Sequence, residues 1–229
     1  MKKAGSPAAL AALLSFNGGY VDTAGFLGLH GLFTAHVTGN FVTLAAALVE
    51  GSHGIIGKLI ALPEFILVIA LARLAGTALR RAAAPVLPVL LGTKVLLLAA
   101  FFALAVTFGP FADPDSPAAL LTGFAGIAAM ALQNAVHRVH LADLPPTTLM
   151  TGSTTQATLD AVDLIVGGAG DKGAVHARLG RLGTSILCFA AGCAASALLY
   201  WLVGFWCLAV PTLVGAVSAL LTVKAAQTR

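Results

Sequence analysis

Long apolar segments constrain this chain more than any other feature of its sequence. Eight apolar windows run along it, at roughly residues 7–29, 34–49, 57–83, 86–109, 117–136, 146–166, 183–203 and 205–223. A helix needs about 20 predominantly apolar residues to cross a bilayer. Six of the windows qualify as complete spans, which predicts an all-α integral membrane protein with a single transmembrane domain over residues 1–229.

The scarcity of charge agrees with this prediction. Only 10% of the residues are charged and 59% are hydrophobic, whereas about 25% of a soluble domain is charged. An aqueous enzyme, a nucleic-acid binder and a disordered chain are therefore excluded, and the bilayer is the expected partner. Basic cytoplasmic loops account for the formal net charge of +4.

Two windows differ from the other six. Residues 147–160 carry six threonines, a serine and a glutamine, and end in an aspartate. Residues 38–50 would form a helix of only about 20 Å at 1.5 Å per residue, against a hydrocarbon core of about 30 Å. We predict that both are re-entrant half-helices, which return to the side from which they enter.

The placement of basic residues supports six spans plus two re-entrant segments. With that topology, the basic positions of the predicted inner loops lie on one side, together with both termini; they are Lys2, Lys3, Arg80, Arg81, Arg138, Lys172, Arg178, Arg181, Lys224 and Arg229. The connection 109–117 carries Asp113 and Asp115 and falls on the other side. Since cytoplasmic loops are enriched in Lys and Arg, both termini are predicted to be cytoplasmic.

The two threonine-rich segments also suggest an internal duplication. Residues 34–40 (TAHVTGN) align with residues 147–153 (TTLMTGS) at an offset of 113 residues, close to half of the chain. Each copy follows one long window and precedes two more. The halves, about 7–113 and 117–225, would thus be an inverted 3+3 repeat, an architecture that recurs among secondary transporters.

Polar residues inside the first window are candidates to line a solute pathway through the membrane. Asn17, Tyr20 and Asp22 lie where a lipid-facing helix would be apolar. A carboxylate at membrane depth is costly unless it is paired, protonated or hydrated, so Asp22 is a candidate coupling or gating group for a proton or cation. An ion pair with an arginine such as Arg73 is the structural alternative. The glycine pair at positions 18 and 19 predicts a kink or break in this helix.

Further candidates lie in the repeated segments and late in the fifth window. If helices begin near Thr38, Gly39 and Asn40, and near Thr151, Gly152 and Ser153, their first N–H groups could bind an anion or polar group. Simple capping by the hydroxyls is the alternative. Gln133 and Asn134 could line a polar path or join helices. The sequence has no motif for a cofactor or metal, and its three cysteines have packing positions.

Four motifs in order resemble the YoaK-like family of bacterial polytopic membrane proteins. They are GYVD at 19–22, FTAHVTGN at 33–40, MALQN at 130–134 and TTLMTG at 147–152. The resemblance covers about residues 10–222 and implies a bacterial inner-membrane protein that is presumed to transport a small molecule.

We therefore expect a transporter or channel for a small polar or anionic solute, with the named polar residues lining its path. Two other classes stay open from the sequence: an intramembrane lipid-modifying enzyme that uses Asp22 with a histidine, and a non-catalytic membrane scaffold. Helix faces rich in small residues are also compatible with a homo-oligomer.

Overall fold

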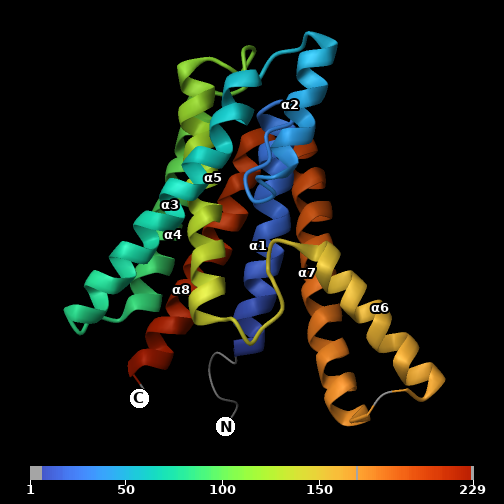
Figure 1. The fold of residues 1–229 in the computed structure, drawn as a ribbon. Helices are drawn as coiled ribbons and strands as arrows, with labels where there is room; N and C mark the ends of the chain where they lie inside the picture. Colours follow the sequence, from blue (N-terminus) through green and yellow to red (C-terminus); the bar gives the residue numbers. More distant parts are fainter. Residues whose placement is uncertain (1–6, 169, 228–229) are drawn as a thin grey trace.

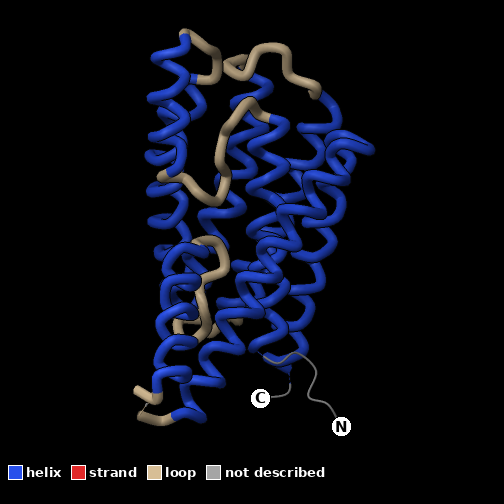
Figure 2. The backbone as a smooth tube through the Cα atoms, turned by 90° about the vertical axis from the view of Figure 1, so that its right-hand side faces the viewer, coloured by secondary structure: helices blue, strands red, loops and turns tan. Residues whose placement is uncertain are grey.

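The structure is a computed structural model, and it describes residues 7–168 and 170–227. These residues form a helical bundle in which Figure 2 shows only helices and loops. In chain order the helices are α1 (Pro7–Gly28), α2 (Gly39–Glu50), α3 (Ile55–Arg81), α4 (Val86–Phe108), α5 (Pro117–His140), α6 (Met150–Val166), α7 (Lys172–Val203), the 3-10 helix η1 (Gly204–Leu208) and α8 (Ala209–Gln227).

Four helical stretches of the described chain are long and apolar enough to cross a membrane. They are α3, α4, α5 and the continuous run from Lys172 to Lys224, which contains α7, η1 and α8. The predicted class, an apolar all-helical protein suited to a membrane, agrees with these helices. The six-span topology and the inverted repeat remain predictions.

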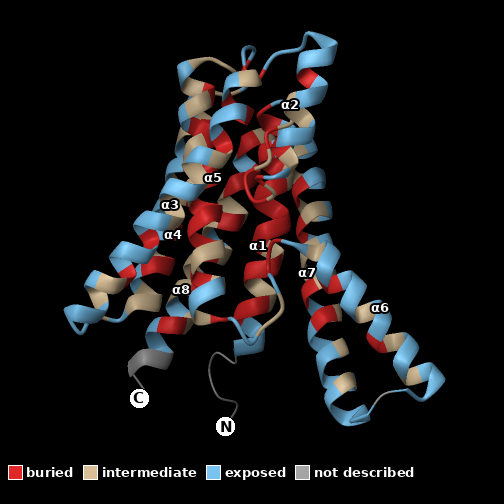
Figure 3. Ribbon diagram, in the orientation of Figure 1, coloured by how far each residue is buried: buried red, intermediate tan, exposed pale blue. Residues whose placement is uncertain are grey.

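Helix α1 differs from the others because it lies in the centre of the bundle. Figure 3 shows it buried between the outer helices, and Ser15, Asn17, Tyr20 and Asp22 are at most 5% exposed. A helix surrounded by protein can carry polar residues because its neighbours, rather than lipid, meet them. This explains why polar residues can lie in the middle of α1.

The course of the chain brings several helix ends together. Figure 1 shows α1, α4 and α7 beginning at one end of the bundle, where α3, α5 and α8 finish; we call this the lower end. The short helix α2 begins at mid-height and runs to the upper end. Helix α6 also begins at mid-height but runs to the lower end. The loops 29–38 and 141–149 that precede α2 and α6 therefore reach into the bundle (Figures 1 and 2).

The contact between α1 and α7 is the most extensive helix pairing, and glycines make it close. Added Cβ atoms at Gly19 and Gly192 would overlap the backbone carbonyls of Phe189 and Phe16, respectively. The predicted break at Gly18-Gly19 is wrong, because α1 is one continuous helix through Gly28. The missing side chains serve close packing instead.

Acidic side chains cap helices at both ends of the bundle. Asp115 accepts hydrogen bonds from the N–H groups of Gly54, Ile55 and Ile56, where α3 begins. Asp171 accepts one from Ala174 at the first turn of α7. Helix α7 consequently begins at Lys172, eleven residues before the apolar window predicted it, because its first three turns are polar and capped rather than hydrophobic.

One salt bridge ties α6 to α7. The Arg178 guanidinium donates to both carboxylate oxygens of Asp160, at 2.6 and 2.7 Å. Gln156 donates to the same carboxylate.

Three of the basic residues used for the predicted topology lie outside the described residues. They are Lys2, Lys3 and Arg229.

Candidate functional site

Two loops from different halves of the chain enter the groove between α1 and α5. The methyl group of Thr34, in loop 29–38, lies against Gly25 of α1 and Gly126 of α5, where added Cβ atoms would come within 2.7 and 3.1 Å of it. The carbonyl oxygen of Thr147, in loop 141–149, lies against Gly18 of α1. Positions 18 and 25 are about 10 Å apart along α1. The loops thus occupy successive levels of one groove.

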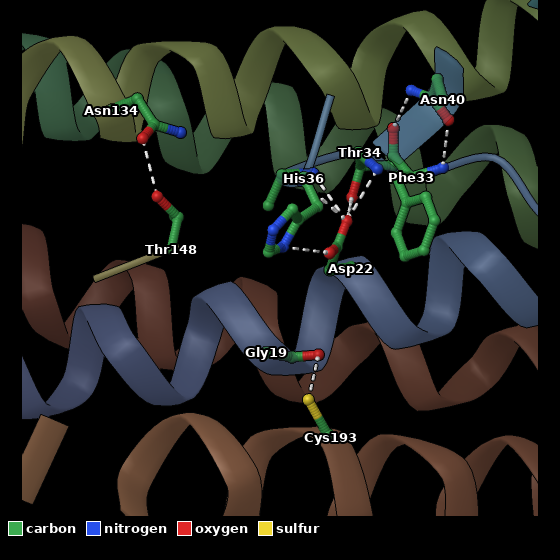
Figure 4. A network of polar contacts seen from close by, with 10 residues as sticks. Gly19, Asp22, Phe33, Thr34, His36, Asn40, Asn134, Thr148 and Cys193 are labelled. Atoms are coloured by element: carbon green, nitrogen blue, oxygen red, sulfur yellow. Dashed lines mark hydrogen bonds and ion pairs between the residues drawn. The ribbon is translucent and has the colours of Figure 1, made fainter. Parts of the chain in front are cut away.

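Asp22 holds the first loop through backbone hydrogen bonds. Its Oδ1 accepts from the N–H groups of Thr34 at 2.8 Å, Ala35 at 2.7 Å and His36 at 3.3 Å. Its Oδ2 lies 3.9 Å from Nδ1 of His36. Figure 4 shows these contacts converging on the carboxylate from the loop above α1. The alternative of an ion pair with Arg73 is wrong, because three consecutive amides and His36 surround Asp22 instead.

Asn40 closes the same loop at the start of α2. Its side-chain amide donates to the carbonyl of Phe33 and accepts from the N–H of Phe33, both at 2.8 Å. This paired contact, also drawn in Figure 4, satisfies both ends of an amide that is only 1% exposed. Asn40 therefore fixes residues 33–40 as a compact turn.

The start of α2 does not offer free N–H groups. Gly39, Asn40 and Phe41 donate to the carbonyls three residues earlier in the chain. Thr38 has helical dihedral angles and makes no capping hydrogen bond. Both sequence-based interpretations of this helix start, anion binding by its amides and capping by Thr38, are therefore wrong: a tight turn uses these donors locally.

The second loop is held by Gln133 and Asn134 of α5. Gln133 donates from Nε2 to the carbonyl of Leu14 on α1, at 2.8 Å, and to Oγ1 of Thr147, at 3.1 Å. Asn134 accepts from the hydroxyl of Thr148 at 2.7 Å, as Figure 4 shows. Both amides thus join loop 141–149 to the helices that flank it.

A buried lysine lies behind this contact. Lys94 of α4 is 0% exposed, and its ammonium group donates to Oε1 of Gln133. A lysine near the end of a span often extends to the membrane surface, but α5 and α8 pack over α4 and enclose this side chain. Among the residues described, it pairs with no carboxylate within 4 Å.

Tyr20 contacts η1 and Asn17 contacts the start of α8, rather than the loops. The hydroxyl of Tyr20 donates to the carbonyl of Cys207, and Nδ2 of Asn17 donates to the carbonyl of Pro211, both at 2.9 Å. Pro211 stands four residues after Cys207 and has no N–H, so the usual helical donor to that carbonyl is missing. The Cys207 carbonyl accepts instead from the N–H of Ala209 and from the hydroxyl of Tyr20.

The remaining predicted residues lie on α6 and are not brought together with the others. Thr151 and Gly152 are exposed, and no atom would contact a Cβ added at Gly152. Ser153 is 3% exposed, and within the described part of the chain its hydroxyl has no hydrogen-bond partner. The helix begins after Leu149, which cannot cap it with its side chain. Capping by Thr151 or Ser153 is therefore wrong.

A cavity of about 540 Å³ lies beside loop 141–149, between α3, α4 and α5. Its polar lining comprises Arg73, Arg80, Asn134, His137, Arg138, His140, Thr147 and Thr148. Only Asn134 of these was a predicted site residue. The arginines were missed because each is near a helix end, where contact with the aqueous interface is the simplest expectation; only the packing shows that they share a cavity.

Comparison with known proteins identifies the family. Residues 10–221 match the family described as "Protein of unknown function (DUF1275)". The chain belongs to this family. The narrower resemblance to the YoaK-like group remains a prediction, since the DUF1275 match does not bear on it. No curated protein and no solved structure matches the chain.

Proposed function

We propose that this DUF1275 protein is a transporter or channel for a small polar or anionic solute, and that the cavity beside loop 141–149 is its solute site. The observation that supports this most is the position of the cavity. Its lining includes Thr147 and Thr148, which belong to one of the two loops between α1 and α5, and Asn134 of α5, which holds that loop. A movement of that loop would change access to the cavity and to the interior groove together.

The proposed architecture is an inverted repeat of two halves, α1–α4 and α5–α8. Its support is the pattern of packing: α1 packs on α7 and α5 on α3, while α2 packs on α3 and α6 on α7. If α1 corresponds to α5, α2 to α6 and α3 to α7, the α1–α7 contact corresponds to the α5–α3 contact, and the α2–α3 contact to the α6–α7 contact. The opposite directions of α1 and α5, and of α2 and α6, in Figure 1 agree with an inversion.

We propose that the lower end faces the cytoplasm of a bacterial cell, with the chain in the inner membrane. Arg80, Arg81 and Arg138 are within the last turn of α3 and α5, and Lys172 begins α7; all of these helix ends lie at the lower end. Basic residues near span ends favour the cytoplasmic side. In this arrangement α2 and α6 are re-entrant from opposite faces.

Reconstituted vesicles test the transport proposal. Uptake of a panel of small organic anions and neutral polar solutes should exceed that of protein-free vesicles, and Asn134→Ala should reduce uptake. The exposed control Arg81→Gln should leave it unchanged. An absence of uptake for every solute in the panel, with correctly inserted protein, would contradict the proposal.

Thiol labelling tests the topology separately. In a variant without its three cysteines, Ser52→Cys beyond α2 and Gly168→Cys beyond α6 should react with an impermeant reagent from opposite sides of the membrane. Reaction of both from the same side would contradict the inverted arrangement while leaving transport open.

A lipid-modifying enzyme is the second candidate, and the pairing of Asp22 with His36 favours it. The two side chains are 3.9 Å apart, which resembles the carboxylate–imidazole pairs of general-base catalysis. Hydrolysis or transfer of a phospholipid by purified protein, abolished by His36→Ala, would support this activity. Unchanged lipid after long incubation would contradict it.

A further inference from the structure

We propose that the cavity takes an amphiphilic organic anion, a carboxylate or phosphate headgroup on an apolar body. This rests on the proposed function, because it names the solute class of the same cavity. The charged lining consists of Arg73, Arg80 and Arg138, and the described lining residues include neither an aspartate nor a glutamate. A guanidinium group has five N–H donors and no acceptor, so the cavity wall favours an anion.

Thr147, which lines the cavity, also offers a hydrogen-bond donor, because its hydrogen bond with Gln133 has a fixed direction. The carbonyl oxygen of Leu14 can only accept, so it holds the NH2 group of Gln133 on its side. The same NH2 group donates to Oγ1 of Thr147, and Lys94 donates to the other end of the amide. Thr147 therefore uses its oxygen as an acceptor and keeps its hydroxyl proton for another partner.

Asn134 is oriented by the same reasoning. Its NH2 group donates to the carbonyl of Met130 at 3.0 Å, and its oxygen accepts from Thr148. The NH2 group has two protons and Met130 takes one. The second proton remains for a group in the cavity, which Asn134 lines. Two neutral donors and three arginines thus belong to residues that line the same cavity.

One unpartnered nitrogen in the lining is available to a polar group in the cavity. Nε2 of His137 is buried and has no hydrogen-bond partner among the described residues, and His137 is part of the cavity lining. Buried polar atoms in proteins are normally paired, because leaving one unpaired costs free energy. A headgroup beside His137 would supply the partner.

The rest of the lining specifies an organic body rather than an inorganic ion. Phe65, Ile69, Leu90, Leu144 and Leu149 contribute apolar side chains. The volume of about 540 Å³ is within the range of about 300–1,000 Å³ typical of small-molecule sites. A hydrated inorganic anion would leave these side chains uncovered, whereas an aryl or alkyl group would cover them.

Calorimetric titration of the full-length protein in detergent tests the proposal, with 4-phenylbutyrate as the probe and its neutral amide, 4-phenylbutanamide, as the matched control ligand. We expect the carboxylate to bind at least tenfold more tightly than the amide. Arg73→Gln and Arg138→Gln should each weaken carboxylate binding at least fivefold, and Thr147→Val at least twofold. Equal affinity for the two ligands, or unchanged affinity in both arginine variants, would overturn the proposal.

Arg81→Gln is the matched control, because Arg81 is adjacent to Arg80 in α3 but does not line the cavity. It should leave the affinity within twofold of the parent. Each variant is first compared with the parent by thermal unfolding without ligand. A variant that unfolds early is replaced by the charge-conserving Arg73→Lys or Arg138→Lys, which should retain binding of the carboxylate but more weakly, as the guanidinium fork is lost.

The headgroup could belong to a free solute or to a lipid, since basic pockets at the cytoplasmic side of membrane proteins also bind anionic lipids. The titration is therefore repeated in nanodiscs of phosphatidylcholine with and without phosphatidylglycerol. Competition by phosphatidylglycerol would support the same chemistry with a lipid as its source; no competition would support a soluble source. If the protein binds the anion but vesicles show no uptake, only the transport proposal is contradicted. If vesicles take up neutral solutes but the protein does not bind the anion, only the proposed solute class is contradicted.

Discussion

Asp22 of α1 and Asn134 of α5 each hold the loop that follows their own helix. Asp22 accepts from the backbone of residues 34–36, and Asn134 accepts from the hydroxyl of Thr148. The residues joined are 12 and 14 positions apart in the chain. Each half therefore fixes its interior loop with a polar side chain of the preceding helix, a carboxylate in the first half and an amide in the second.

The first prediction concerns Asp22. Asp22→Ala leaves the N–H groups of Thr34 and Ala35 without an acceptor inside the protein, so it should lower the free energy of unfolding by about 2–4 kcal/mol. Asp22→Asn keeps an acceptor oxygen and should cost about half as much. Thermal unfolding in detergent measures both effects, and hydrogen exchange should be faster at residues 34–36 in particular.

The exposed Asp163 provides the control for this comparison. Asp163→Ala should change stability by less than about 0.5 kcal/mol, as is usual for surface substitutions. Equal effects of the two alanine variants would show that the Asp22 contacts do not hold the loop.

The second prediction uses the glycine contact between α1 and α7. A Cβ at Gly192 overlaps the backbone of Phe16, which cannot move aside as a side chain can. Gly192→Ala should therefore destabilise the protein by about 1–3 kcal/mol. Gly180→Ala on the same helix meets no atom within 4 Å and should be neutral or stabilising by up to about 1 kcal/mol. The same sign for both substitutions in an unfolding titration would contradict this packing.

Helix positions could be predicted from the sequence better than contacts could. The predicted starts of α1, α4 and α5 agree with the structure, and the predicted short helix over residues 38–50 contains α2, because apolar length and flanking prolines act locally. The 3-10 turn η1 between α7 and α8 was not predicted. Its residues, Gly204–Leu208, are as apolar as the helices on either side.

The partners of the polar residues could not be predicted, since they depend on packing between distant segments. Tyr20 and Cys207 are 187 residues apart, and Gln133 and Leu14 are 119 apart. The sequence identified Tyr20 and Gln133 as unusual at membrane depth but contains no local signal for their partners. Asp22 is an intermediate case. The loop that it holds directly follows α1 in the chain, yet which N–H groups donate to Asp22 depends on the fold of residues 33–40.

The third prediction concerns the buried Lys94. Lys94→Met removes a buried cation whose partner is a neutral amide, which favours stability, but it also leaves Oε1 of Gln133 without its donor, which costs about 1–3 kcal/mol. The two effects oppose each other, so the free energy of unfolding should change by less than about 2 kcal/mol. Lys94→Ala adds a cavity and should cost about 2–5 kcal/mol. Equal losses in the two variants, measured by denaturant titration in detergent, would show that the hydrogen bond to Gln133 outweighs packing.

The last prediction follows from the unusual donor to Cys207. The Cys207 carbonyl accepts from the Ala209 N–H and from the Tyr20 hydroxyl, while Pro211, four residues on, has no N–H to donate. Tyr20→Phe removes one of these donors and should destabilise the protein by about 1–2 kcal/mol. In a Pro211→Ala background the new backbone N–H can reach that carbonyl, so the same Tyr20→Phe change should cost measurably less. A double-mutant cycle by thermal unfolding should give a coupling energy of about 0.5–1.5 kcal/mol between positions 20 and 211. Additive effects of the two substitutions would contradict a link between Pro211 and the Tyr20 hydrogen bond. The control pairs Tyr20→Phe with Pro85→Ala, at a proline remote in sequence before α4. The effects of those two substitutions on the free energy of unfolding should add.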